Sequence, residues 1–178
     1  MLDVAVSYRR YYFLGQEFLT WLWYATENEP ESLSELFSEG VVVTVGNRIM
    51  IERRNQEDVE RVTIRGDQAE MDEGLVALRK GGLVVEVHLV VEVGDFQWTF
   101  NVKGESLTIS GLKVPATAGV EAPDELEGAV LEKAALCEKA VQVLDTLYSH
   151  FLKLRVSENW QTRVVPAVRT WCMSAGQD

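Results

Sequence analysis

Few residues in this 178-residue sequence could carry chemistry, and only two of them are histidines. His88 follows Glu86 by two positions, so on a strand the two side chains would share one face and could supply two metal ligands. A cross-strand hydrogen bond between His88 and Asn101 is the alternative interpretation. His150 has no histidine or carboxylate four residues before or after it. The sequence therefore gives a metal site only weak support.

The usual sequence signatures of an active site are absent. There is no H-E-x-x-H, no Walker A loop, and no G-x-G-x-x-G or G-x-S-x-G motif. Glu132, Glu138 and Asp145 are mixed with lysines along one predicted helix, which is typical of a solvated face. Cys137 and Cys172 lack C-x-x-C spacing and are expected to be reduced. We predict no catalytic residue, no metal ligand and no cofactor, and a protein that is not an enzyme.

The composition is that of a folded protein, with 47% hydrophobic and 25% charged residues. A chain of this length can bury about 70% of its unfolded surface in one core, so we predict a single domain over residues 1–178. The net charge of −11 argues against direct binding of nucleic acid, because phosphate binding normally relies on basic side chains. No apolar run reaches the ~18 residues that cross a bilayer, and the first residues lack the pattern of a signal peptide. We therefore expect a cytoplasmic protein without a membrane partner.

The aromatic-rich segment over residues 11–27 predicts the helix around which the rest of the chain is organised. Its apolar side chains share one face at helical spacing. That face comprises Leu14, Phe18, Trp21, Leu22 and Ala25. Trp23 projects among the polar residues Gln16, Thr20 and Glu27 on the other face, so either a neighbouring element of the chain or a partner covers it. These four residues are the candidate partner surface.

Residues 41–112 predict a sheet with one inserted helix. A short helix over residues 31–38 precedes it, and alternating valines then begin a strand at Val41. A three-residue loop over residues 46–48 would pair Val45 with Ile49 and keep one face apolar. A strand over residues 59–65 follows this hairpin. The inserted helix over residues 68–80 is expected to have Asp67 as its N-cap and to bury Met71, Leu75 and Leu78.

The second half of the predicted sheet contains its best-defined hairpin. A strand over residues 83–93 is joined to the next by a two-residue turn at Gly94 and Asp95, which pairs Val93 with Phe96 and His88 with Asn101. In this register every inward position is apolar on both strands. A last strand over residues 107–112 brings the total to about six strands in a mainly antiparallel sheet.

The C-terminal part, residues 124–173, is predicted to be helical. Apolar residues recur every three or four positions along a long first helix, which is expected to run from near Asp124 to near Ser157. This seam consists of Leu126, Val130, Ala134, Cys137, Val141, Leu144, Tyr148 and Phe151. The helix is longer than one such sheet can cover, so part of it lies on another subunit, or it bends or breaks near Gly128. Pro166 predicts a kink or a fresh helix start beyond it. The fold class is therefore α+β, with the sheet packed with an N-terminal aromatic helix, a short central helix and a long C-terminal helix.

Several segments together resemble the C-terminal region of bacterial RdgC-type recombination-associated proteins. The distinctive segment is FLGQEFLTWLWY, residues 13–24, and weaker similarity covers residues 62–82, 108–117, 151–160 and 168–171. The resemblance implies a non-enzymatic protein of DNA recombination and replication whose members form ring-like dimers around duplex DNA. The sequence departs from that pattern in two ways: its 178 residues are not expected to include the large N-terminal part of the family, and it is acidic.

These observations favour an interaction or assembly domain that self-associates or binds a protein partner. Any DNA association would then pass through the partner or the oligomer, or through a local basic surface at Arg53, Arg54, Arg61 and Arg65. The alternative is a small-ligand domain with a pocket between the sheet and the first helix, near Trp21, Trp98 and Phe100. A metal-dependent enzyme at His88 is the third and weakest hypothesis.

Overall fold

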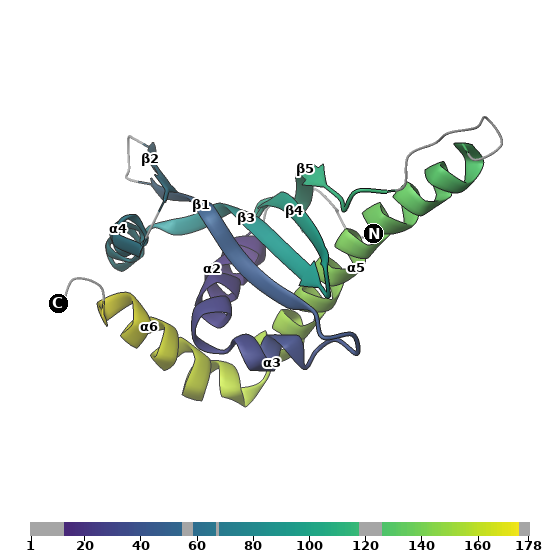
Figure 1. Ribbon diagram of the computed structural model, residues 1–178. Coiled ribbons are helices and arrows are strands. Elements are labelled where there is room, and N and C mark those ends of the chain that lie inside the picture. The colour runs from purple at the N-terminus through teal and green to yellow at the C-terminus, as the bar shows by residue number, and fades with distance from the viewer. Residues whose placement is uncertain (1–12, 55–58, 67, 118–125, 175–178) are drawn as a thin grey trace, which may run out of the picture.

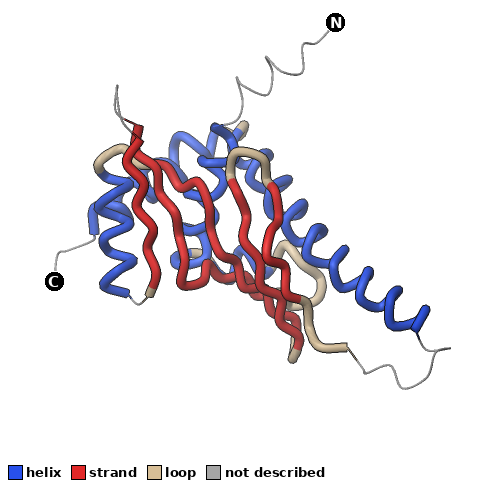
Figure 2. Tube along the Cα trace, turned by 90° about the horizontal axis from the view of Figure 1, so that it is seen from above, coloured by secondary structure: helices blue, strands red, loops and turns tan. Residues whose placement is uncertain are grey.

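The computed structural model describes residues 13–54, 59–66, 68–117 and 126–174, and confirms the α+β fold class (Figure 1). The elements follow in the order α2 (Phe13–Asn28), α3 (Pro30–Ser34), β1 (Val42–Arg54), β2 (Val59–Arg65), α4 (Gln68–Arg79), β3 (Leu83–Val93), β4 (Phe96–Lys103), β5 (Thr108–Lys113), α5 (Leu126–Arg155), η2 (Trp160–Val164) and α6 (Val165–Ser174). The strands form one antiparallel sheet in the order β2-β1-β3-β4-β5. Figure 2 shows this sheet with α2 and α5 on one of its faces.

The β3–β4 hairpin has the register that the sequence predicts. Val93 pairs with Phe96, Leu89 with Phe100, and the other positions follow in step. On the polar face the His88 Nδ1 and Asn101 Oδ1 atoms are 3.1 Å apart. This is the cross-strand hydrogen bond that the sequence offered as the alternative to a metal site. The register is fixed because alternating burial and a two-residue turn demand the same pairing.

The predicted hairpin at residues 46–48 is wrong, and this is why the described sheet has five strands where about six were expected. Residues 42–54 form one long strand that pairs with β3 along almost its whole length, with a bulge between Val45 and Ile49. Val45 pairs with Leu89 and Ile49 with Val87, so the bulge returns both side chains to the apolar face. A bulge and a hairpin loop at residues 46–48 would both keep the apolar residues on one face of the sheet. The bulge forms because β3 is long enough to pair with the residues on both sides of it.

Helix α2 lies at the centre of the packing. It contacts β1 and β3 on one side and α3, α5 and α6 around the others. Phe18, Leu19, Leu22 and Trp23 have no exposed surface, and Trp21 is 3% exposed. A helix that is apolar on nearly every side is buried on every side. The predicted start of this helix at Tyr11 lies outside the described residues.

Helix α4 covers the β2 edge of the sheet. It contacts β1, β2 and α6, and its residue Leu75 is buried, while Leu78 is half-buried. Asp67 and the Met71 side chain lie outside the described residues, so the predicted N-cap and the third member of the stripe are not described.

The C-terminal segment turns back after α5 and packs α6 against α2 and α4. The predicted fresh helix start near Pro166 is confirmed, because α6 begins at Val165 and Pro166 is its second residue. The five residues before Val165 form a π-helical turn, in which the Val165 amide donates to the Trp160 carbonyl oxygen. Pro166 has no amide hydrogen and its ring crowds the carbonyl four residues earlier, so the turn before it widens.

Candidate functional site

Trp23 is fully buried by another element of the same chain, which is the first of the two alternatives that the sequence left open, so its ring is not available to a partner. Helix α6 folds back over this side of α2 and sets the Trp171 ring against Trp23, with centroids 4.9 Å apart at 85°. Gln16 is also buried, and its Oε1 atom has no hydrogen-bond partner among the described residues. Thr20 is half-buried and donates to the Gln16 carbonyl oxygen. The polar face of α2 is thus an internal interface between two helices of the same chain.

Glu27, the fourth residue of that candidate surface, is exposed, and its carboxylate accepts a hydrogen bond from each of the indoles of Trp23 and Trp171. The Trp23 Nε1–H donates to Glu27 Oε1 at 2.6 Å, and the Trp171 Nε1–H donates to Glu27 Oε2 at 3.0 Å. Hydrogen bonds to a carboxylate are stronger than neutral ones. Glu27 therefore fixes α6 on α2 by satisfying both indole donors.

The predicted basic surface is interleaved with acidic residues. Cross-strand pairing places Arg61 opposite Glu52, and their side chains form an ion pair at 2.5 Å. Arg53 lies 3.9 Å from Glu60 in the same way, and Arg65 is exposed. The side chain of Arg54 lies outside the described residues. Neighbouring carboxylates therefore offset the charge of Arg53 and Arg61, two of the four arginines of the predicted basic surface.

Neither histidine lies in a group suited to metal binding. No cluster of three or more histidine, cysteine, aspartate or glutamate side chains occurs in the part of the chain that the structure describes. His150 lies against Trp21, with ring centroids 5.8 Å apart. Burial, aided by the charge of Lys153, lowers the pKa of His150 below its ordinary value of 6.5. The imidazole is therefore neutral at pH 7.

We expect His150 to weaken the fold in mild acid. Its pKa is lower in the folded chain than in the unfolded chain, so below pH 6.5 the unfolded state binds the proton first and stability falls until the folded pKa is reached. Urea unfolding of the wild type and His150→Gln at pH 7 and pH 5 measures this contribution. The wild type should lose more stability than the variant over this interval, and equal losses would contradict the assignment.

Trp98 and Phe100, which were expected to line a pocket, both belong to the core of the described chain. Phe100 has no exposed surface, and the Trp98 Nε1–H donates to the Leu136 carbonyl oxygen at 2.9 Å. This bond ties α5 to β4. Two other features of the described chain have the exposure and composition of a contact site, one on α5 and one beside α6.

The first feature is an exposed apolar stripe on the half of α5 that extends beyond the sheet (Figures 1 and 2). The helix is continuous through Gly128, and the buried residues of α5 begin only at Ala140. Three residues of the predicted apolar seam, two of them before Ala140 and one directly after it, face solvent: Leu126, Val130 and Val141 are 57%, 59% and 55% exposed. We call the residues Leu126, Val130, Ala134 and Val141 the α5 stripe.

The α5 stripe is separate from the face that packs on the sheet. At about 100° per residue, its centre lies roughly 110° around the helix from the face formed by Ala140, Val143 and Leu147. The later members of the predicted seam, Leu144 and Phe151, are buried in the chain itself. The seam is thus divided, with its second half used in the core and its first half left exposed.

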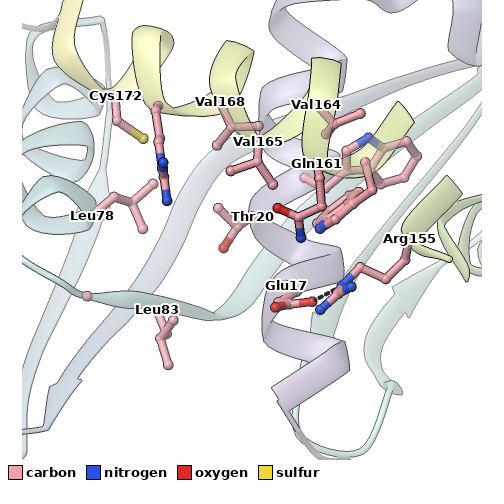
Figure 3. A pocket seen from close by; sticks show the side chains of 14 residues that line it. Glu17, Thr20, Leu78, Leu83, Arg155, Gln161, Val164, Val165, Val168 and Cys172 are labelled. Atoms are coloured by element: carbon pink, nitrogen blue, oxygen red, sulfur yellow. Dashed lines mark hydrogen bonds and ion pairs between the residues drawn. The ribbon is translucent and has the colours of Figure 1, made fainter. Parts of the chain in front are cut away.

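The second feature is an open groove of about 400 Å³ between α2, the start of β3 and α6 (Figure 3). We call it the α6 groove. It is lined by Glu17, Thr20, Trp21, Leu78, Gly82, Leu83, Arg155, Trp160, Gln161, Val164, Val165, Val168, Arg169 and Cys172. Trp21 is the one member of the predicted pocket that contributes to it. Sequence reasoning missed the groove because its walls come from opposite ends of the chain.

Cys172 lies at one end of the α6 groove, beside Leu78 (Figure 3). Burial raises the pKa of its thiol, and the charge of Arg79 opposes this effect only in part. The thiol is therefore protonated at neutral pH, and a protonated thiol is a poor nucleophile. The groove is suited to binding more than to covalent catalysis.

Comparison of the chain with protein-family models, with curated proteins and with solved structures finds no match. None of the described helices is both long and apolar enough to cross a membrane.

Proposed function

We propose that this chain is a non-enzymatic assembly domain of a recombination-associated system, and that it pairs with a second copy of itself through the α5 stripe. The observation that carries the proposal is the exposed apolar half of α5. The part of α5 before Ala140 has no buried residue, and a helical segment of about 12–15 residues without packing partners is marginal in water. An exposed apolar stripe on such a segment marks an interaction site. The link to recombination rests on the resemblance of residues 13–24 to the RdgC-type proteins.

The charges beside the stripe favour a second copy as the occupant. In heptad terms Val130 and Cys137 take d positions, and Ala134 and Val141 take a positions. In a parallel pair, Lys133 at position g then faces Glu138 of the second copy at position e. Both side chains are exposed in the single chain, so they are available for this contact.

The geometry of the chain is compatible with this parallel pair. Because the stripe and the sheet-packing face of α5 are roughly 110° apart, a two-fold axis along the helices would place the two sheets on opposite sides. Two heptads form a small interface, at the low end of specific interfaces, so we expect a dissociation constant on the order of micromolar.

The test is light scattering or sedimentation over a concentration series. The wild type should approach twice the monomer mass as its concentration rises, and Val130→Glu should remain a monomer because the carboxylate would be buried in the interface. Val156→Glu is the matched control, since Val156 is 85% exposed and lies outside the stripe. A wild type that stays monomeric into the millimolar range would refute the pairing.

Charge exchange tests the orientation of the pair. Lys133→Glu should weaken association by placing two carboxylates together, and Lys133→Glu/Glu138→Lys should restore it by reversing the ion pair. In an antiparallel pair these positions do not face each other. If the double variant associates as the wild type does, the parallel register is supported. If it associates no better than Lys133→Glu, the parallel register is excluded.

A duplex DNA titration at low salt tests how the recombination link operates. We expect the chain alone to bind weakly or not at all, because its charge is −11 and Arg53 and Arg61 are offset by carboxylates. Tight binding that is lost in Arg65→Gln would show instead that a local basic surface contacts DNA directly.

A further inference from the structure

The α6 groove contains the one π-helical turn in the described part of the chain. Trp160, Gln161 and Val164 of this turn line the groove. Single π-helical turns occur frequently at functional sites. The widened turn moves side chains away from regular helical positions. Here the turn places Trp160 within reach of Arg155, whose guanidinium carbon lies 5.3 Å from the centre of the ring.

The long wall of the groove is aliphatic. Val164, Val165, Val168 and Cys172 follow one another along η2 and α6 above Thr20 (Figure 3). From Val164 to Cys172 the chain advances 172 − 164 = 8 residues, or about 12 Å of helix. Leu78 and Leu83 contribute apolar surface on the opposite side, so the groove offers an elongated apolar bed.

The charges of the groove are distributed unequally between its ends. At one end Glu17 and Arg155 form an ion pair at 2.7 Å and offset each other. Toward the Cys172 end, Arg169 lines the groove and Arg79 is close enough to affect the thiol. Neither Arg79 nor Arg169 has an ion-pair partner among the described residues. In a chain of net charge −11, this end of the groove thus carries two arginines that no described carboxylate pairs with.

We propose that the α6 groove binds an amphipathic monocarboxylate with a linear aliphatic body. The carboxylate lies toward Arg169, and the aliphatic chain runs along Val168 and Val165 toward Trp160. Ligand sites of this size are mostly apolar with a few polar groups that fix orientation, and arginine is the side chain that best matches a carboxylate. The proposal is independent of the pairing through the α5 stripe.

Calorimetric titration of the full chain with decanoate tests the proposal. Decanoate should bind saturably, and Arg169→Gln should weaken binding about tenfold or more, which corresponds to the loss of one hydrogen bond to a charged group. Decanol, which has the same chain without the charge, should bind the wild type about tenfold more weakly. Arg163→Gln is the matched control, because Arg163 lies on η2 outside the groove and should leave the affinity unchanged.

Thiol labelling locates the ligand. In a Cys137→Ser background, decanoate should slow the reaction of Cys172 with a maleimide at least tenfold at saturation. The proposal fails if decanoate does not bind, or if Arg169→Gln and the wild type bind it equally. It also fails if Cys172 stays reactive while Val130→Glu abolishes binding, because the amphiphile then lies on the α5 stripe.

Discussion

Replacing Trp23 with alanine is expected to cost about 3–5 kcal/mol of folding free energy, the range for a buried tryptophan. The Trp23 ring has no exposed surface. It packs edge-on against Trp171, and its Cη2 atom lies 2.9 Å from the position that a Cβ on Gly74 would occupy. Truncation therefore removes the contact surface of three elements at once, α2, α4 and α6, and leaves Glu27 without one of its two donors. Urea unfolding monitored by circular dichroism measures the loss.

The matched control is Phe96→Ala, because Phe96 is an aromatic residue that is 55% exposed. It should cost far less than Trp23→Ala. A double-mutant cycle with Trp171→Ala isolates the ring contact, and a coupling of about 0.5–1.5 kcal/mol is expected for an aromatic pair. If Trp23→Ala unfolds at nearly the wild-type urea concentration, the packing of α6 over α2 is not the structure in solution.

The burial of Trp23 also shows where sequence reasoning reaches its limit. Helical periodicity placed Trp23 among polar residues and left open whether another element of the chain or a partner covers it. Two clues in the sequence favoured an element of the chain. The helix is apolar on most of its circumference, and Trp171 belongs to a second apolar stripe that needs a partner. No local pattern states that these two stripes meet, because they lie at opposite ends of the chain.

Local patterns succeeded where two independent signals agreed. The β3–β4 register followed from alternating apolar residues together with a two-residue turn. At residues 46–48 only the alternation was present, and it is satisfied equally by a loop and by a bulge. The choice between them depends on β3, a strand that lies much later in the sequence.

The spacing of apolar residues predicted the long helix α5 correctly, but this spacing does not show which molecule covers the apolar seam. Leu144 and Phe151 meet the chain's own core, whereas Val130 and Val141 are exposed. The difference arises because the helix extends beyond the sheet, as its predicted span from near Asp124 to near Ser157 implied. The α6 groove had no sequence signal at all, because Glu17 and Arg155 come together only when the fold is complete.

Replacing Gly15 with alanine is expected to destabilise the fold by about 3 kcal/mol or more, the upper range for overpacking a core. A Cβ at Gly15 would lie 1.6 Å from the carbonyl oxygen of Gly104 and 2.6 Å from its carbonyl carbon. Both atoms belong to the backbone of the turn between β4 and β5, which is held by the Gly104 amide donating to the Val85 carbonyl oxygen at 2.8 Å. Since no flexible side chain can give way, α2 must move off the sheet or the turn must open.

Alanine substitutions at two further glycines give a scale for the destabilisation expected at Gly15. Gly104→Ala should cost less, because its added Cβ would stand 3.1 Å from the nearest atoms, where small shifts relieve the strain. Gly128→Ala meets nothing within 4 Å in the exposed half of α5 and should stabilise the chain by about 0.5–1 kcal/mol, the helix preference of alanine over glycine. We expect the urea midpoint to rise from Gly15→Ala, the least stable, through Gly104→Ala and the wild type to Gly128→Ala, the most stable. Because the first of these substitutions acts only through the contact of α2 with the β4–β5 turn, a Gly15→Ala midpoint equal to the wild type would mean that this contact does not form.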